Sequence, residues 1–133
     1  MKIDYAARDI VRWKDTELAD ALSNMFLWYP LTIAIIFWHS WWLAGAYALT
    51  FGLSQLVKRL TDRARPDGSD NHSFFSGHTS TAFVAVGFCA PLFLIPAMLV
   101  GYLRMAANKH WLTDVAAGAL VGALMGGLAQ WLK

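Results

Sequence analysis

Two long uncharged stretches dominate the pattern of polar and apolar positions along the chain. No residue from Ala21 to Val57 carries a formal charge, and none from Asn71 to Leu103 does. A bilayer-spanning helix needs about 20 apolar residues, so the first stretch is too long for one span and fits a hairpin of two short ones. The polar pair His39-Ser40 marks the expected break, because tryptophans flank it as they do at the headgroup level of membranes.

The second stretch begins as a polar loop and becomes apolar near Thr79. Pro91 and Pro96 interrupt it and predict a turn between two spans. Each span would have roughly 15 residues, which is short for a hydrocarbon core. A last span is expected from about residue 111 to 131. Its glycines at four-residue spacing predict close packing of this helix inside its own bundle: Gly118, Gly122 and Gly126.

The first 22 residues differ from the rest because charged and apolar side chains alternate in them. Such a segment cannot span a bilayer, and an amphipathic helix lying at the interface is expected over residues 1–22. The expected fold class is therefore all-α. We predict a polytopic membrane helix bundle, one domain over residues 1–133, with about five short spans after the interfacial helix.

Composition agrees with this interpretation. Hydrophobic residues make up 57% of the chain and charged residues 15%, whereas soluble domains carry about 25% charged residues. The 11 basic and 9 acidic residues nearly balance, which argues against a nucleic-acid partner. In the predicted topology all Lys and Arg except Lys133 share one face with all the acids. The positive-inside rule would put that face in the cytoplasm.

This charged face carries residues that suit phosphate chemistry. Lys58, Arg65 and Arg104 could converge on a phosphate, because Arg offers a fork of donors and Lys a point charge. Ser76 and Gly77 precede a predicted helix. Their backbone N–H groups, at the positive end of that helix, would add donors to a phosphoryl oxygen.

The same face carries two histidines and an acid with catalytic potential. His110 and Asp114 are four residues apart, so on a helix they would share a face, and the carboxylate would hold one imidazole nitrogen. The other nitrogen of His110 would then be free as a nucleophile, while His78 could protonate a leaving oxygen. Together these residues predict phosphoryl transfer through a phosphohistidine without a metal or other cofactor.

At these residues the chain resembles the type 2 phosphatidic acid phosphatases, whose superfamily includes vanadium haloperoxidases and bacterial acid phosphatases. The family pattern is K-x6-RP, then PSGH, then SR-x5-H-x3-D. The chain has KRLTDRARP, FSGH and LRMAANKHWLTD. It departs from the pattern at Phe75, where the family usually has Pro, and at Leu103, where the family usually has Ser.

The resemblance covers about residues 42–132 and implies a catalytic core there. It implies a lipid phosphate monoester or pyrophosphate as substrate, with the lipid tails among the spans and membrane lipids as surroundings. Phosphatidic acid, phosphatidylglycerol phosphate, undecaprenyl pyrophosphate and lipid A phosphate all fit. The family's site usually faces the periplasm or cell exterior. This implies a bacterial inner or plasma membrane protein with an extracytoplasmic site, in conflict with the positive-inside rule.

Other interpretations remain open at this point. A haloperoxidase would hold vanadate in the same pocket, although those enzymes are known as long soluble chains. A non-catalytic lipid-binding or scramblase-like bundle would need the cations but not the histidines and Asp114. Outside the pattern, Arg59, Arg63 and Lys109 are interpreted as cations reaching the headgroups. His72 is interpreted as a solvated loop residue.

Overall fold

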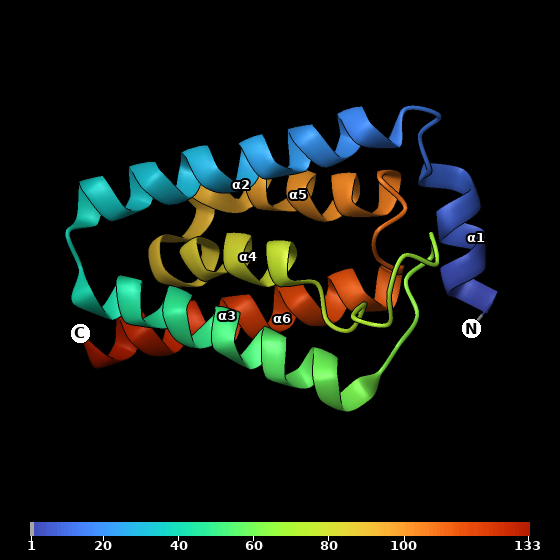
Figure 1. Cartoon of the computed structure of the whole chain (residues 1–133). Helices are drawn as coiled ribbons and strands as arrows, with labels where there is room; N and C mark the ends of the chain where they lie inside the picture. Colours follow the sequence, from blue (N-terminus) through green and yellow to red (C-terminus); the bar gives the residue numbers. More distant parts are fainter. Residues whose placement is uncertain (1) are drawn as a thin grey trace.

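The computed structural model describes residues 2–133, and every regular element in that range is helical (Figure 1). Helix α2 (Thr16–Trp38) and helix α3 (Trp41–Thr61) form the predicted hairpin, with its break at His39-Ser40. His39 ends α2 in the left-handed region, at φ +44°, and the Ser40 hydroxyl caps α3 by accepting the Leu43 N–H at 3.3 Å. The predicted position of this turn is confirmed.

The second uncharged stretch also reverses where the prolines predict. Helix α4 (Gly77–Cys89) runs into the 3-10 turn η1 (Ala90–Phe93) and then into helix α5 (Leu94–Ala106). Pro91 lies in the 3-10 turn, and Pro96 lies in the first turn of α5, where a missing backbone N–H is tolerated. Both helices have 13 residues, so the expectation of two short elements is confirmed.

Helix α6 (Leu112–Leu132) packs on α4 through its glycines. A Cβ at Gly118 would lie 2.7 Å from the Ser76 carbonyl oxygen, and one at Gly122 or Gly126 would overlap carbonyl oxygens of α4. The small-residue stripe therefore serves contact within the bundle, as predicted. One consequence is that the N-terminal ends of α4 and α6 lie side by side (Figure 1).

The single interfacial helix predicted over residues 1–22 is wrong. Helix α1 (Lys2–Val11) ends before Asp15, whose carboxylate accepts the Leu18 N–H at 2.9 Å and starts α2. This local cap divides the segment, since a helix N-terminus needs an acceptor for its free N–H groups. Helix α1 lies across the end of the bundle (Figure 1), and its Asp4 is 1% exposed.

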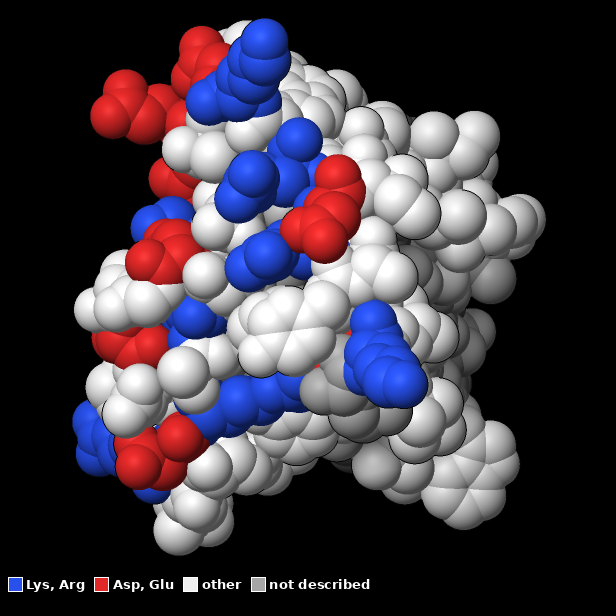
Figure 2. All heavy atoms as spheres, turned by 90° about the vertical axis from the view of Figure 1, so that its right-hand side faces the viewer, with Lys and Arg blue, Asp and Glu red and all other residues white. Residues whose placement is uncertain are grey.

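The bundle carries its charges at one end and apolar side chains along its length. Helices α2 and α6 are long and apolar enough to cross a membrane, and α5 belongs to a shorter apolar segment. Large apolar side chains are exposed along α2, α3 and α6, including Ile36, Phe37, Leu49, Leu56 and Leu124. The end that holds α1 shows Lys and Arg interleaved with Asp and Glu (Figure 2). Lys133 lies at the opposite end (Figure 1).

Candidate functional site

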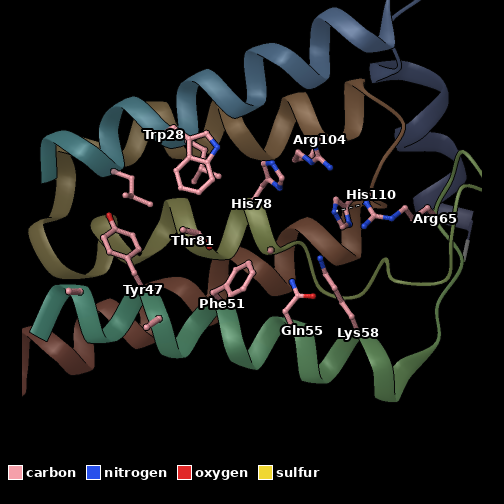
Figure 3. Close-up of a pocket in the computed structure, with 15 residues that line it drawn as sticks. Trp28, Tyr47, Phe51, Gln55, Lys58, Arg65, His78, Thr81, Arg104 and His110 are labelled. Carbon is pink, nitrogen blue, oxygen red and sulfur yellow. Dashed lines mark hydrogen bonds between the residues drawn. The ribbon is translucent and has the colours of Figure 1, made fainter. Parts of the chain in front are cut away.

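A cavity of about 500 Å³ joins the charged end to an apolar channel between α2 and α3. Its polar end brings together the predicted residues Lys58, Arg65, Gly77, His78, Arg104 and His110. Its apolar end is lined by Leu27, Trp28, Leu31, Ala44, Tyr47, Ala48 and Phe51. Figure 3 shows the two groups at opposite ends of one space. The sequence motifs, although far apart along the chain, therefore meet in one site.

The three predicted cations reach this cavity from three different segments. Lys58, from the last turns of α3, points toward Gly77, where an added Cβ would come within 3.3 Å of its Nζ. Arg65 comes from the loop after α3, and its Nε donates to Asp70 at 2.7 Å. Arg104 comes from the last turn of α5 and is 5% exposed. The geometry thus gathers positive charge around one point, as an anion site requires.

His110 is held with one nitrogen fixed and the other facing Arg65. Its Nδ1 lies 2.8 Å from the Ser73 carbonyl oxygen, which can only accept, so Nδ1 carries the proton. In the neutral ring Nε2 then carries the lone pair, which accepts from Nη1 of Arg65 at 3.4 Å. His110 is 2% exposed. The unprotonated nitrogen therefore faces the cationic end of the cavity (Figure 3).

Burial lowers the pKa of His110 to about 4. The nearby Asp114 raises it, while the positive charges of Arg104, Arg65 and Lys58 lower it further. The imidazole is consequently neutral at neutral pH, which is the state that a nucleophile needs.

Asp114 lies beside His110 as predicted, but it is not the residue that accepts the ring's hydrogen bond. His110 precedes α6 instead of lying on it, and its Nδ1 is 3.8 Å from Oδ2 of Asp114, whereas the same nitrogen is 2.8 Å from the Ser73 carbonyl oxygen. Asp114 instead accepts the Ser73 hydroxyl and, at 2.9 Å, the Trp111 N–H. Asp114 thus fixes Ser73, and the carbonyl of Ser73 orients His110.

His78, on the first turn of α4, is also held by a residue that the sequence motifs do not include. Its Nε2 lies 2.7 Å from Oδ1 of Asn24, and Nδ2 of Asn24 donates to the Asp20 carbonyl at 3.2 Å. Because the Asn24 amide is oriented by that second bond, Nε2 of His78 carries the proton and donates it. In this arrangement the proton on Nε2 is engaged by Asn24.

Ser76 does not offer its backbone N–H to the cavity as predicted. That N–H donates to the Asp114 carbonyl at 3.1 Å, and the fully buried Ser76 hydroxyl pairs with Thr79 at 2.8 Å. Ser76 therefore caps α4 and ties it to α6. Gly77, the first residue of α4, does line the cavity and remains the backbone donor candidate.

Several further polar contacts at this end were not predicted. Arg104 forms an ion pair with Asp20 of α2 and donates to Ser23 at 3.2 Å. Arg63 pairs with Asp4 and Asp114, each at 2.8 Å. The interpretation of Arg63 as a cation reaching the headgroups is therefore wrong. No spacing signal in the sequence connects these partners, because they come from segments far apart along the chain.

Three other sequence interpretations have clear outcomes. Lys109 pairs with Asp67 at 2.9 Å and is not a free headgroup cation. His72 is exposed in its loop, as expected. Leu103, where the resemblance leads one to expect Ser, is 3% exposed and packs in a small apolar cluster between α2 and α5. That departure thus supplies apolar packing between α2 and α5.

Comparison with known proteins identifies the family of the chain. The model of the PAP2 superfamily matches residues 67–133. The chain is 37% identical over 101 residues to a lipid A 1-phosphatase of Porphyromonas gingivalis. It is 33% identical over 107 residues to a decaprenylphosphoryl-5-phosphoribose phosphatase of Mycobacterium tuberculosis. These alignments cover 65% and 68% of the chain, but 22% and 59% of the relatives. No solved structure gives a significant match.

The depressed pKa of His110 predicts a pH-dependent stability. Between its ordinary pKa of 6.5 and about 4, the unfolded chain binds a proton that the folded chain does not. The free energy of unfolding should therefore fall as the pH drops through this window, by up to about 3 kcal/mol from this group. His110→Asn keeps a donor for the Ser73 carbonyl but cannot titrate. Chemical denaturation in detergent from pH 7 to 4 should give the variant a shallower pH slope, and equal slopes would contradict the assignment.

Proposed function

Because the chain belongs to the PAP2 superfamily, we propose that it is a membrane-embedded phosphatase that hydrolyses a lipid phosphate monoester or pyrophosphate. The observation that carries this proposal is the continuity of the cavity from His110 and the cations to the apolar channel. A lipid phosphate carries both an anionic group, which suits the cations, and an apolar tail, which suits the channel. The two relatives, named for lipid A and for a decaprenyl phosphoribose, support a lipid substrate.

The cations supply binding and charge stabilisation. A phosphate at the polar end would lie among Lys58, Arg65 and Arg104, with the Gly77 N–H at the start of α4 as a further donor. Nε of Arg104 is buried without a hydrogen-bond partner among residues 2–133. An unpaired buried donor is costly, and a phosphoryl oxygen would satisfy it. Binding would also compete with Asp20 for the guanidinium of Arg104.

His110 is the proposed nucleophile. Its Nε2 lone pair would form the bond to phosphorus while the bond from phosphorus to the leaving oxygen breaks. The Ser73 carbonyl, 2.8 Å from Nδ1, holds the ring and stabilises the positive charge that develops on it. Water would then attack the phosphohistidine and release phosphate. No step of this scheme calls for a metal ion, because the cations carry the charge that a metal would otherwise neutralise.

His78 is the proposed proton donor to the leaving oxygen and, in the second half, the base that accepts a proton from water. In the structure its Nε2 is bonded to Asn24. Proton donation therefore requires either a second proton on Nδ1 or release of the Asn24 amide. Asn24 thus sets which nitrogen of His78 serves the reaction.

Membrane embedding is proposed from the surface of the bundle. The exposed apolar side chains on α2, α3 and α6 would be costly in water and favourable in lipid. Helices α2 to α6 alternate in direction, so five spans would place both the site and α1 at one membrane face, with α1 lying at the interface. The lipid tails would enter between α2 and α3, where the apolar end of the cavity lies.

Phosphate release from purified protein in detergent tests the proposed activity. Phosphatidic acid, a prenyl pyrophosphate and lipid A phosphates form the substrate panel. We expect His110→Ala to lower kcat by several orders of magnitude with little change in affinity, because the cations remain. His39→Asn, at the far turn, is the control and should leave kcat unchanged. An active His110→Ala protein would refute the nucleophile, and an inactive wild type on every substrate would favour a binding protein.

The covalent intermediate can be trapped in the same preparation. Denaturation in alkaline detergent after brief exposure to labelled substrate should leave acid-labile, base-stable phosphate on the wild type and none on His110→Ala. If His110→Ala retains the label while His78→Ala loses it, the two histidines have exchanged roles.

Metal independence is a separate expectation. Activity should survive EDTA, and orthovanadate should inhibit because it resembles five-coordinate phosphorus and would be held by the same cations. Loss of activity in EDTA that Mg²⁺ restores would overturn the metal-free scheme. Inhibition by orthovanadate should weaken in Arg65→Gln but not in the exposed-residue control Arg59→Gln.

The proposed site faces away from the cytoplasm, in a bacterial inner or plasma membrane. Most basic side chains at this end are paired with acids or face the cavity, which reduces the force of the positive-inside argument. With five spans, Lys133 would lie in the cytoplasm. A fluorescent reporter that folds only in the cytoplasm, fused after Lys133, should therefore fluoresce in a bacterial host. If this fusion is not fluorescent, and a reporter that is active only in the periplasm is active at the same position, the site would face the cytoplasm.

A further inference from the structure

We propose that Asp4 of α1 is a positioning residue of the active site, acting on His110 through Arg63, Asp114 and Ser73. This inference rests on the proposed function, because it assigns how the nucleophile of that function is held. Asp4 and Arg63 lie outside the family pattern and outside the residues 67–133 that match the family model.

Asp4 is a buried carboxylate and not a surface charge. Its exposure is 1%, in a helix whose other residues are exposed or half-buried. Oδ1 accepts the Thr113 N–H at 3.1 Å, which is one of the free N–H groups in the first turn of α6. Oδ2 accepts the Thr113 hydroxyl at 3.1 Å and pairs with Nη2 of Arg63 at 2.8 Å. A carboxylate at this point also suits the positive end of α6.

Arg63 transmits this anchor to the site. Nη2 binds Asp4, and Nη1 binds Oδ1 of Asp114 at 2.8 Å, so one guanidinium joins two carboxylates. The opposite oxygen of Asp114 accepts the hydroxyl of Ser73, which is fully buried. The Ser73 carbonyl then accepts Nδ1–H of His110. Each link is a hydrogen bond to a buried group, and the chain ends on the ring that attacks phosphorus.

Helix α1 also packs against Trp111, the residue that follows His110. The Tyr5 ring meets the Trp111 ring edge-on, with centroids 5.0 Å apart. The Trp111 indole N–H donates to the Ala64 carbonyl at 2.9 Å. Asp4 and Tyr5 thus contact the residues on both sides of Leu112, and they fix the segment from Trp111 to Thr113 that follows the nucleophile. Contacts so close to His110 along the chain can hold its ring within the positional tolerance that catalysis requires.

The test compares Asp4→Asn with Asp9→Asn. Asparagine at position 4 can still accept the Thr113 N–H, but its amide cannot pair with Arg63. We expect kcat to fall about ten-fold, as a small displacement of a nucleophile does, with KM within about two-fold because Lys58, Arg65 and Arg104 are untouched. Asp9 is exposed on the same helix and pairs with Arg8, so Asp9→Asn should match the wild type.

A double-mutant cycle separates positioning from general loosening of the fold. If Asp4 acts through Asp114, then Asp4→Asn should change kcat by less than about two-fold in an Asp114→Asn background. Independent losses that multiply would overturn the inference, and so would an Asp4→Asn protein that behaves like Asp9→Asn. If Asp4→Asn does not fold, Arg63→Lys replaces it in the cycle, because lysine keeps the charge but cannot join two carboxylates.

A spectroscopic measurement keeps the inference testable without activity. In protein labelled with ¹⁵N-histidine, the His110 ring should show a protonated Nδ1, assigned by its absence in His110→Asn. Asp4→Asn should weaken or broaden this signal, while Asp9→Asn should leave it unchanged. An unchanged signal in Asp4→Asn would refute the positioning role. If the wild type has no phosphatase activity but Asp4→Asn still perturbs this signal, the proposed function is refuted and the positioning network stands.

Discussion

The fully buried carboxylate of Asp114 constrains the whole charged end of the bundle. A charge without solvent contact has to be compensated by neighbours, or the fold becomes unstable. Asp114 achieves this with the Arg63 guanidinium, the Ser73 hydroxyl and the Trp111 N–H. These donors come from the loop after α3 and from the start of α6, so satisfying one carboxylate fixes both segments. The glycine stripe that brings α6 against α4 then places Ser76 within reach of the Asp114 backbone.

The same principle explains the contribution of α2. Arg104 is nearly buried, and Asp20 supplies the opposite charge that makes its burial tolerable in the absence of an anion. Asn24, one turn further along, holds His78. In the proposed function, a phosphate that enters the cavity would replace Asp20 with a phosphoryl oxygen at Arg104. Helix α2 therefore touches both the proposed binding cation and the proposed proton donor, and its apolar turns line the apolar end of the same cavity.

Much of the fold was readable in the sequence because its signals are local. The polar pair His39-Ser40 in an apolar run predicted the hairpin turn, Pro91 predicted the second turn, and the spacing of Gly118, Gly122 and Gly126 predicted close packing. The charged residues and histidines at the polar end of the cavity followed from fixed spacings within short motifs, whereas the residues of its apolar end did not. The interfacial helix over residues 1–22 failed because a single cap, Asp15, starts a new helix inside an amphipathic segment.

The partners of the site residues could not be read in this way. Asp4, Asp20 and Asn24 lie in helices that carry no family motif, and each meets its partner across at least 50 residues of chain. Such pairings depend on how the helices finally pack, which periodicity does not encode. The Asp114 case shows the same limit at short range. A spacing of four residues predicted a shared helix face, but His110 precedes the helix, so Asp114 lies 3.8 Å from Nδ1 and the hydrogen bond of that nitrogen goes to Ser73.

The position of α1 explains why the contacts of Asp4 and Arg63 gather at the first turn of α6. The first turn of α6 carries Asp114 and begins two residues after His110, so any fraying of that turn would move both the proposed nucleophile and Asp114 beside it. A helix start frays unless its free N–H groups find acceptors. Asp4 provides an acceptor from a separate helix, and its charge also balances Arg63, which in turn balances Asp114. If His110 is the nucleophile, an unconstrained loop would let it lose its alignment with the cations, and the buried ion pairs behind it would then serve the reaction as well as stability.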